Sequence, residues 1–145
     1  MEVGAREATE HDRGIVDALT ALAIAEQVDS RGGSVWAVRE AMRDPGLDAT
    51  TFVGTVDDTV VGFARVGVDE LADSRRLGIV TQIYVDPGAR EVSIGELLLD
   101  ACIEWCRSRG CIGVDAHALP GNRETKNFFE TAGLTARLIV VHKAL

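Results

Sequence analysis

Residues 84–101 read YVDPGAREVSIGELLLDA. A strand pattern runs into Pro87 and Gly88, a short polar segment follows, and apolar residues then recur at helical spacing. The first N–H groups of a helix have no partner within the helix, and they carry a partial positive charge. A strand-to-helix junction of this kind can therefore bind an anion such as a phosphate group.

The helix after this junction is the clearest one in the chain. Its apolar residues fall on one face at spacings of three and four, and acidic residues occupy the opposite face. Gly110 ends the pattern as a typical C-cap. The apolar face consists of Ile94, Leu98, Ala101 and Trp105, and the acidic face of Glu96, Asp100 and Glu104.

Outward from this helix, strand and helix patterns alternate. Asp57-Asp58 separates two segments rich in Val, Thr and Phe, which predicts a hairpin. Thr9 and Asp12 resemble a capping box at the start of the first helix. The expected strands cover residues 2–8, 50–56, 59–68, 78–85, 111–118 and 135–143, and the expected helices cover residues 10–28, 35–43, 94–109 and 122–132.

This order predicts an α/β fold with a mixed sheet. The early strands pair as antiparallel hairpins, whereas the strands on either side of the 94–109 helix should form a parallel crossover. A chain of 145 residues is long enough for one domain with its own core, so residues 1–145 are interpreted as a single domain.

Composition excludes several classes of function. The net charge of −8 argues against a nucleic-acid surface, which requires clustered Lys and Arg. No apolar run approaches the roughly 20 residues of a membrane span, and the start MEVGAREATEHD lacks the apolar centre of a signal peptide. We therefore expect a cytoplasmic protein with no nucleic-acid or membrane partner.

Three cysteines lie within ten positions, at Cys102, Cys106 and Cys111. Their number is odd, and none has the CxxC spacing of a metal or redox site. We interpret them as buried free thiols and expect no metal.

Two motifs identify the family that the chain resembles. Val85-Asp86-Pro87 ends a strand, and the segment from Arg90 to Gly95 then opens a helix with the pattern R-x-x-S-x-G. Farther on, Asn122 is followed seven residues later by Phe129, and Gly133-Leu134 closes the segment. With this element order, both motifs resemble the GNAT superfamily of acyl-CoA N-acyltransferases over nearly the whole chain.

The resemblance implies a fold and a cofactor. The fold is a mostly antiparallel six-stranded sheet flanked by about four helices, with a parallel strand pair that splays apart at the cofactor site. The cofactor is acetyl-CoA, with its pantetheine arm beside the splayed strand and its pyrophosphate at the helix start. The residues expected to bind it are Ile83, Tyr84, Val85, Arg90, Glu91, Val92, Ser93, Ile94, Gly95, Glu96, Asn122 and Phe129.

The catalytic residues that the resemblance implies are replaced in this chain. Many family members carry a carboxylate base on the strand before the motif, where this chain has Thr81 and Gln82. Many also carry a tyrosine as the acid at the position of Phe129. Tyr84 and His117 are the candidate substitutes, because a phenol can donate a proton and an imidazole can accept one near neutral pH. Each also has a purely structural interpretation, as a packed core side chain.

Two classes of function remain open at this point. The first is an N-acetyltransferase that moves an acetyl group from acetyl-CoA to a small-molecule or peptide amine. The second is a catalytically weak or inactive coenzyme A-binding domain that senses or regulates. A homodimer is compatible with either. The family's acceptor region corresponds here to Glu26, Asp29, Trp36 and the loop 69–76. None of these residues identifies the substrate.

Overall fold

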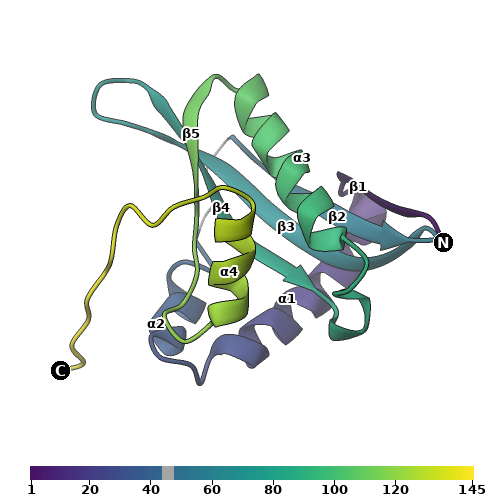
Figure 1. The fold of residues 1–145 in the computed structure, drawn as a ribbon, viewed down its shortest axis with the longest axis horizontal. Coiled ribbons are helices and arrows are strands. Elements are labelled where there is room, and N and C mark those ends of the chain that lie inside the picture. The colour runs from purple at the N-terminus through teal and green to yellow at the C-terminus, as the bar shows by residue number, and fades with distance from the viewer. Residues whose placement is uncertain (44–47) are drawn as a thin grey trace.

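Five strands form one mixed sheet in the computed structural model, which describes residues 1–43 and 48–145 (Figure 1). The strands are hydrogen-bonded side by side in chain order, and four helices accompany them. The strands are β1 (Val3–Glu7), β2 (Ala49–Val56), β3 (Thr59–Glu70), β4 (Arg76–Val85) and β5 (Cys111–Ala116), and the helices are α1 (Arg13–Gln27), α2 (Gly33–Val38), α3 (Ile94–Ser108) and α4 (Arg123–Thr131). The expected mixed α/β fold is confirmed.

The pairing directions follow the predicted pattern. β1 to β4 pair antiparallel, and β5 is parallel to β4 across the α3 crossover. Asp57 and Asp58 both have positive φ, 47° and 66°, as a two-residue hairpin turn of the favoured twist requires. The backbone N–H of Glu2 donates to the Asp57 carboxylate, which ties β1 to this turn.

β4 contains one extra residue near its middle. Arg65 of β3 pairs with Gln82, but the next residue, Val66, pairs with Val80, so Thr81 has no partner on β3 and forms a bulge. On the other side of β4, the parallel ladder to β5 has Val80 and Ala116 as its last pair. Because β4 runs on to Val85, its last five residues extend past the end of β5.

Two cores lie on opposite faces of this sheet. α3 covers one face, and the side chains buried beneath it include Phe52, Ala64, Val66, Val80, Leu98, Cys102 and Trp105. α1 packs on the other face, where Val16, Leu19 and Ala23 contact Val53, Phe63 and Tyr84. The alternation between Phe52 and Val53, and between Phe63 and Ala64, is the period of two expected for a sheet covered on both faces.

A partly buried ion pair fixes the entry to α1. Asp12 is 6% exposed and accepts two hydrogen bonds from the guanidinium of Arg6, at 2.7 and 3.0 Å. It also accepts from the backbone N–H of Thr9, at 2.8 Å. The hydrogen bonds from Arg6 lower the pKa of Asp12 most, and that from Thr9 adds to the effect, so the pKa lies well below its usual range. The predicted capping relation between Thr9 and Asp12 is confirmed.

The expected sixth strand is absent from the structure, which corrects the strand count from six to five. Residues 135–143 have no regular secondary structure, and the chain after α4 runs away from the sheet (Figure 1). Leu138, Ile139, Val140 and Val141 are 70–90% exposed. β-branched residues favour strands because they pack against neighbouring strands. Residues 135–143 have no such neighbour, so their strand preference does not produce a strand.

The second helix also differs from its prediction. It covers Gly33–Val38 rather than 35–43, because Ala41 donates its N–H to the carbonyl of Trp36, five residues back, and this wider turn ends the helix. Pro45, at which the sequence predicted the helix to stop, lies outside the described residues. None of the helices in the described ranges is long and apolar enough to cross a membrane.

Ser93 adopts the backbone conformation that usually requires glycine. It immediately precedes α3 with φ 63° and ψ 15°, in the left-handed region. This conformation costs about 1–2 kcal/mol for a residue with a Cβ atom. A glycine would hold this conformation without that cost, and Ser93 holds it under strain.

We expect Ser93→Gly to stabilise the protein by about 0.5–1 kcal/mol. The substitution removes the left-handed strain, and the greater freedom of glycine in the unfolded chain offsets part of that gain. Urea or thermal unfolding of the purified variant measures the change.

Ser74→Gly is the matched control, because Ser74 has φ 70° in the loop between β3 and β4. It should give a similar stabilisation. A stability loss in Ser93→Gly together with a gain in Ser74→Gly would show that the Ser93 side chain makes a stabilising contact.

Candidate functional site

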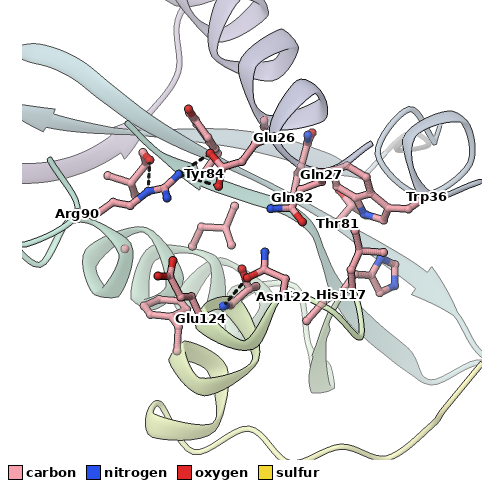
Figure 2. Close-up of a pocket in the computed structure, with 18 of the residues that line it drawn as sticks. Glu26, Gln27, Trp36, Thr81, Gln82, Tyr84, Arg90, His117, Asn122 and Glu124 are labelled. Carbon is pink, nitrogen blue, oxygen red and sulfur yellow. Dashed lines mark hydrogen bonds and ion pairs between the residues drawn. The ribbon is translucent and has the colours of Figure 1, made fainter. Parts of the chain in front are cut away.

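A cavity of about 280 Å³ lies where β4 extends past β5 (Figure 2). Its walls come from the end of α1, the second half of β4, the start of α3, the segment after β5, and the start of α4. The residues that line it are Ala23, Glu26, Gln27, Trp36, Thr81, Gln82, Ile83, Tyr84, Val85, Arg90, Gly95, Glu96, His117, Ala118, Leu119, Asn122, Glu124, Thr125 and Phe128.

Arg90 closes one end of this cavity. Its guanidinium donates to both carboxylate oxygens of Glu26, at 3.1 and 2.9 Å, and its Nε donates to the carbonyl of Val85 at 2.8 Å. It also lies over the ring of Tyr84, 5.4 Å from the centroid. Arg90 therefore joins the end of α1 to the end of β4 across the cavity mouth.

The starts of α3 and α4 meet at the same end. Gly95, in the first turn of α3, faces the ring of Phe128 so closely that a Cβ atom there would lie 3.1 Å from the ring edge. Asn122 caps α4 by accepting a hydrogen bond from the N–H of Thr125. The free N–H groups at the start of α3 are thus adjacent to the cavity, because Gly95 and Glu96 line it.

Tyr84 lies on the face of β4 that packs against α1. Its side chain is 9% exposed and belongs to the cluster with Phe63 and Leu19. Burial raises the pKa of its phenol, and the charge of Glu26 raises it further, while Arg90 lowers it. Tyr84 is therefore protonated at neutral pH and can act only as a proton donor.

His117 follows the last residue of β5 at the opposite end of the cavity, beside Trp36 (Figure 2). Its backbone N–H donates to the carbonyl of Val80 at 3.3 Å, which continues the parallel ladder by one bond. Burial lowers the pKa of its imidazole, although the charges of Glu40 and Asp115 act in the other direction. A neutral imidazole is the form that accepts a proton.

Gln27 and Gln82 lie between these two ends (Figure 2). Gln82 is 4% exposed and accepts a hydrogen bond from Arg65 at 2.8 Å. Gln27 is the last residue of α1, and Trp36 of α2 stands next to it as a half-buried wall. The cavity therefore has a charged end at Arg90 and a neutral, polar centre.

Eight of the residues predicted from the sequence line this cavity: Ile83, Tyr84, Val85, Arg90, Gly95, Glu96, His117 and Asn122. Tyr84 and His117, the two candidate catalytic residues, lie at different ends of it (Figure 2). The remaining predicted residues, Glu91, Val92, Ser93, Ile94 and Phe129, are outside the lining, and Ile94 and Phe129 are buried in the α3-side core.

Phe128 occupies the lining position that was assigned to Phe129. Phe129 is 5% exposed in the core, and its neighbour Phe128 faces Gly95 and the cavity. Consecutive helix residues point about 100° apart, so a motif spacing alone did not decide which of the two rings faces the ligand.

The sequence also left Gln27, Glu124, Thr125 and Phe128 unassigned. Gln82, which the sequence analysis named only as the position of a missing base, also lines the cavity. Its spacing of two from Tyr84 could have indicated this, since alternate strand residues share a face. Within residues 1–43 and 48–145, no cluster of His, Cys, Asp or Glu could hold a metal ion.

Solved structures with this fold include several acetyltransferases. Over 100% of both chains, BH1408 from Bacillus halodurans is similar at 20% identity with a TM-score of 0.79. Glucosamine-6-phosphate N-acetyltransferase from Arabidopsis thaliana is 20% identical, with a TM-score of 0.71 over 99% of both chains. The enzyme AAC(6')-Iy, in complex with a CoA-containing bisubstrate analogue, is 18% identical, with a TM-score of 0.74 over 100% of both chains. At these identities the similarity shows the fold alone.

The sequence itself decides the family. A comparison with curated proteins finds no significant match. The model of the acetyltransferase (GNAT) family, however, matches residues 16–134, which include β4, α3 and α4 and most of the cavity. This chain therefore belongs to the GNAT family of acetyltransferases.

Proposed function

We propose that this protein transfers an acetyl group from acetyl-CoA to the amino group of a small molecule. The observation that carries the proposal is the separation of β4 from β5 after Val80, beside a cavity that reaches the start of α3. The last five residues of β4 lie past the end of β5, so their backbone groups are available to an extended chain of amides. The pantetheine arm of coenzyme A is such a chain.

The residues present fit the phosphate end of coenzyme A. The first N–H groups of α3 favour a negative charge, and the absence of a side chain at Gly95 lets the ring of Phe128 pack against this helix start. Arg90 adds a cation at the same end of the cavity. Glu26 opposes the pyrophosphate, because it neutralises Arg90 and places a carboxylate at the mouth of the cavity.

The chemistry requires a proton acceptor for the amine and a proton donor for the leaving thiolate. Acetyl-CoA supplies an activated acyl group as its thioester. His117 is half-buried just after β5, at the end of the cavity opposite Arg90, and its lowered pKa keeps it neutral at pH 7, so it can take the proton of the acceptor ammonium. Tyr84 stays protonated and can give a proton. Binding both reactants in one cavity contributes further, since orientation can be worth about 7–11 kcal/mol.

The alternative is a coenzyme A-binding sensor without turnover. It is favoured by Phe129, which has no proton to donate and lies in the core, and by the distance of Tyr84 from His117 along the cavity (Figure 2). Release of free thiol from acetyl-CoA in the presence of a panel of small amines separates the two functions. Binding of coenzyme A without amine-dependent thiol release would establish the sensor.

We expect Gly95→Asp to weaken coenzyme A binding by at least about tenfold, or 1.4 kcal/mol. The new carboxylate would stand beside the expected pyrophosphate and would crowd Phe128. Isothermal titration calorimetry measures the affinity.

Two further variants separate charge from crowding. Gly95→Ala crowds Phe128 without adding a charge and should have the smaller effect. Gly14→Asp places the same carboxylate near the start of α1, where a Cβ atom meets nothing within 4 Å, and should leave the affinity unchanged. Equal affinities in wild type and Gly95→Asp would show that the cofactor binds elsewhere.

We expect Glu26→Gln to strengthen coenzyme A binding by roughly two- to fivefold, which is the range of one exposed ion pair. The substitution frees Arg90 for the pyrophosphate and removes an opposing charge. The gain should shrink as salt is added, because the interaction is electrostatic.

Glu104→Gln is the matched control for this effect. Glu104 is an exposed partner of Arg107 on α3, so its loss also removes one ion pair and one negative charge. Its effect on affinity should be small. A similar gain in both variants would mean that net charge matters and that the Glu26–Arg90 contact does not.

We expect His117→Gln to reduce kcat/KM and to remove the acid limb of its pH profile. The pKa of His117 is lowered, so the wild-type imidazole is in its basic form above about pH 6.5 and kcat/KM falls only below that value, as it becomes protonated. His11→Gln, at an exposed position in the turn before α1, is the control. An unchanged acid limb in His117→Gln would exclude His117 as the base.

The same shift makes a stability prediction. Folding keeps His117 neutral, so the unfolded chain binds more protons near pH 6 and stability declines as the pH falls below about 6.5. The melting temperature of His117→Gln should fall less than that of wild type over this pH range, as measured by thermal unfolding. Parallel curves for the two proteins would contradict the burial of a neutral imidazole.

A further inference from the structure

Unpaired buried polar atoms gather in the cavity. In the part of the chain that the structure describes, four buried side-chain atoms have no hydrogen-bond partner. One is Trp105 Nε1, which lies in the α3-side core, and the other three belong to cavity-lining residues: Gln27 Oε1, Gln82 Nε2 and His117 Nδ1. A buried polar atom without a partner has lost its hydrogen bond to water and gained none in return, which destabilises the folded protein. Their concentration at one place indicates a site that a polar ligand completes.

The orientation of the Gln82 amide follows from its neighbour. Arg65 is the cross-strand partner of Gln82, and its guanidinium donates to Oε1 at 2.8 Å. A guanidinium can only donate, so it cannot pair with the amide nitrogen. The oxygen of Gln82 must therefore face Arg65, and the NH₂ group must point the other way.

Arg65 is itself held in place. Its second nitrogen donates to the hydroxyl of Thr20 at 3.0 Å, and that hydroxyl uses its single proton on the carbonyl of Val16. The guanidinium also lies over the ring of Phe63, 5.0 Å from the centroid. The chain of contacts from α1 through Arg65 thus keeps the Gln82 amide from turning over.

The side of the sheet on which Gln82 lies indicates which reactant its amide would contact. Gln82 is on the same face as Tyr84, under α1, together with Gln27 at the end of that helix. α3, whose first turn fits the pyrophosphate, covers the opposite face, and Ile83 and Val85 pack toward it. A donor on the α1 face is therefore placed for the acceptor amine and not for the coenzyme.

We propose that Gln82 is a specificity-determining residue that selects acceptor amines bearing an oxygen atom, as a hydroxyl, ether or carbonyl, near the amino group. The inference rests on the proposed function and names its substrate class. Nε2 donates to that oxygen, so an amine with only an alkyl chain leaves the buried donor unpaired. The free amide oxygen of Gln27 can then accept a hydrogen bond from the ammonium, and the imidazole of His117 can take its proton.

The test uses amine pairs that differ by one atom. 2-Methoxyethylamine and butylamine differ only in an ether oxygen in place of a methylene group, as do 3-methoxypropylamine and pentylamine. An ether oxygen accepts but never donates, so a preference for it reports a donor in the protein. The measured quantity is the ratio of kcat/KM for the ether amine to that for its alkyl partner.

Two variants remove the donor in different ways. Gln82→Glu keeps an oxygen for Arg65 and replaces the NH₂ group by a second oxygen. Gln82→Met has a similar length and neither donates nor accepts a conventional hydrogen bond. We expect the ratio of at least one pair to fall about five- to tenfold in both variants, which corresponds to one neutral hydrogen bond. Thermal unfolding checks that each variant is folded.

The outcomes separate this inference from the proposed function. An unchanged ratio in both variants overturns the role of Gln82, whatever the overall rate. A loss of kcat that is equal for both members of a pair also overturns it, because it assigns Gln82 to the acetyl group instead.

If no amine releases thiol from acetyl-CoA, the proposed function fails. Calorimetric titration of the coenzyme A-bound protein with each pair then still tests the inference, through the ratio of affinities in wild type and in the two variants. The same five- to tenfold fall in that ratio supports the role of Gln82, and an unchanged ratio refutes it.

Discussion

The bulge at Thr81 is the feature on which the rest of the site depends. The extra residue breaks the alternation of β4, so that Val80 and Ile83 share the α3 face while Gln82 and Tyr84 share the α1 face. At the same point the ladder to β5 ends. The exposed edge of β4 thus begins at the inserted residue, which also places the side chains of Gln82 and Tyr84 on the α1 side of the sheet.

This dependence explains how far the sequence could be interpreted. Hydrophobic periodicity predicted α1, α3, α4 and the strands from β1 to β5, because each has a covered face that sets its pattern. The parallel crossover and the junction at Pro87 were also predictable, since both depend on local signals. Periodicity failed for residues 135–143, where an apolar β-branched run has no neighbouring strand to pack against.

Side-chain directions within the site were harder to predict. Strict alternation from Tyr84 would place Val80 on the α1 face, and the bulge moves it to the other one. The choice between Phe128 and Phe129 depends on how α4 is rotated against Gly95, and no motif spacing carries that information. Ser93 is a further case, because the pattern R-x-x-S-x-G did not predict that its backbone lies in the left-handed region.

The charges around the cavity separate its two tasks. Arg90 is shared between Glu26, the carbonyl of Val85 and the ring of Tyr84, so binding an anion at α3 requires it to give up contacts it already has. The helix N–H groups have no such competing contacts, so under the proposed function they would be the principal source of phosphate affinity. The acidic side chains at that end, Glu26, Glu96 and Glu124, instead favour the approach of a cationic amine.

The Arg65–Gln82 pair has a stability cost that its position explains. A leucine at residue 82 would bury well against Phe63 and Tyr84 and would leave no amide unpaired, whereas Gln82 keeps a buried donor without a partner. Arg65 is also partly buried where it holds that amide, and this burial lowers its pKa because desolvation opposes its charge. Local departures of this kind from the most stable arrangement are expected where a site is prepared for a ligand. Since Thr20, Arg65 and Gln82 pair along this chain of contacts, the atom left unpaired is Gln82 Nε2 at the cavity, and under the proposed role an acceptor atom of the bound amine pairs with it.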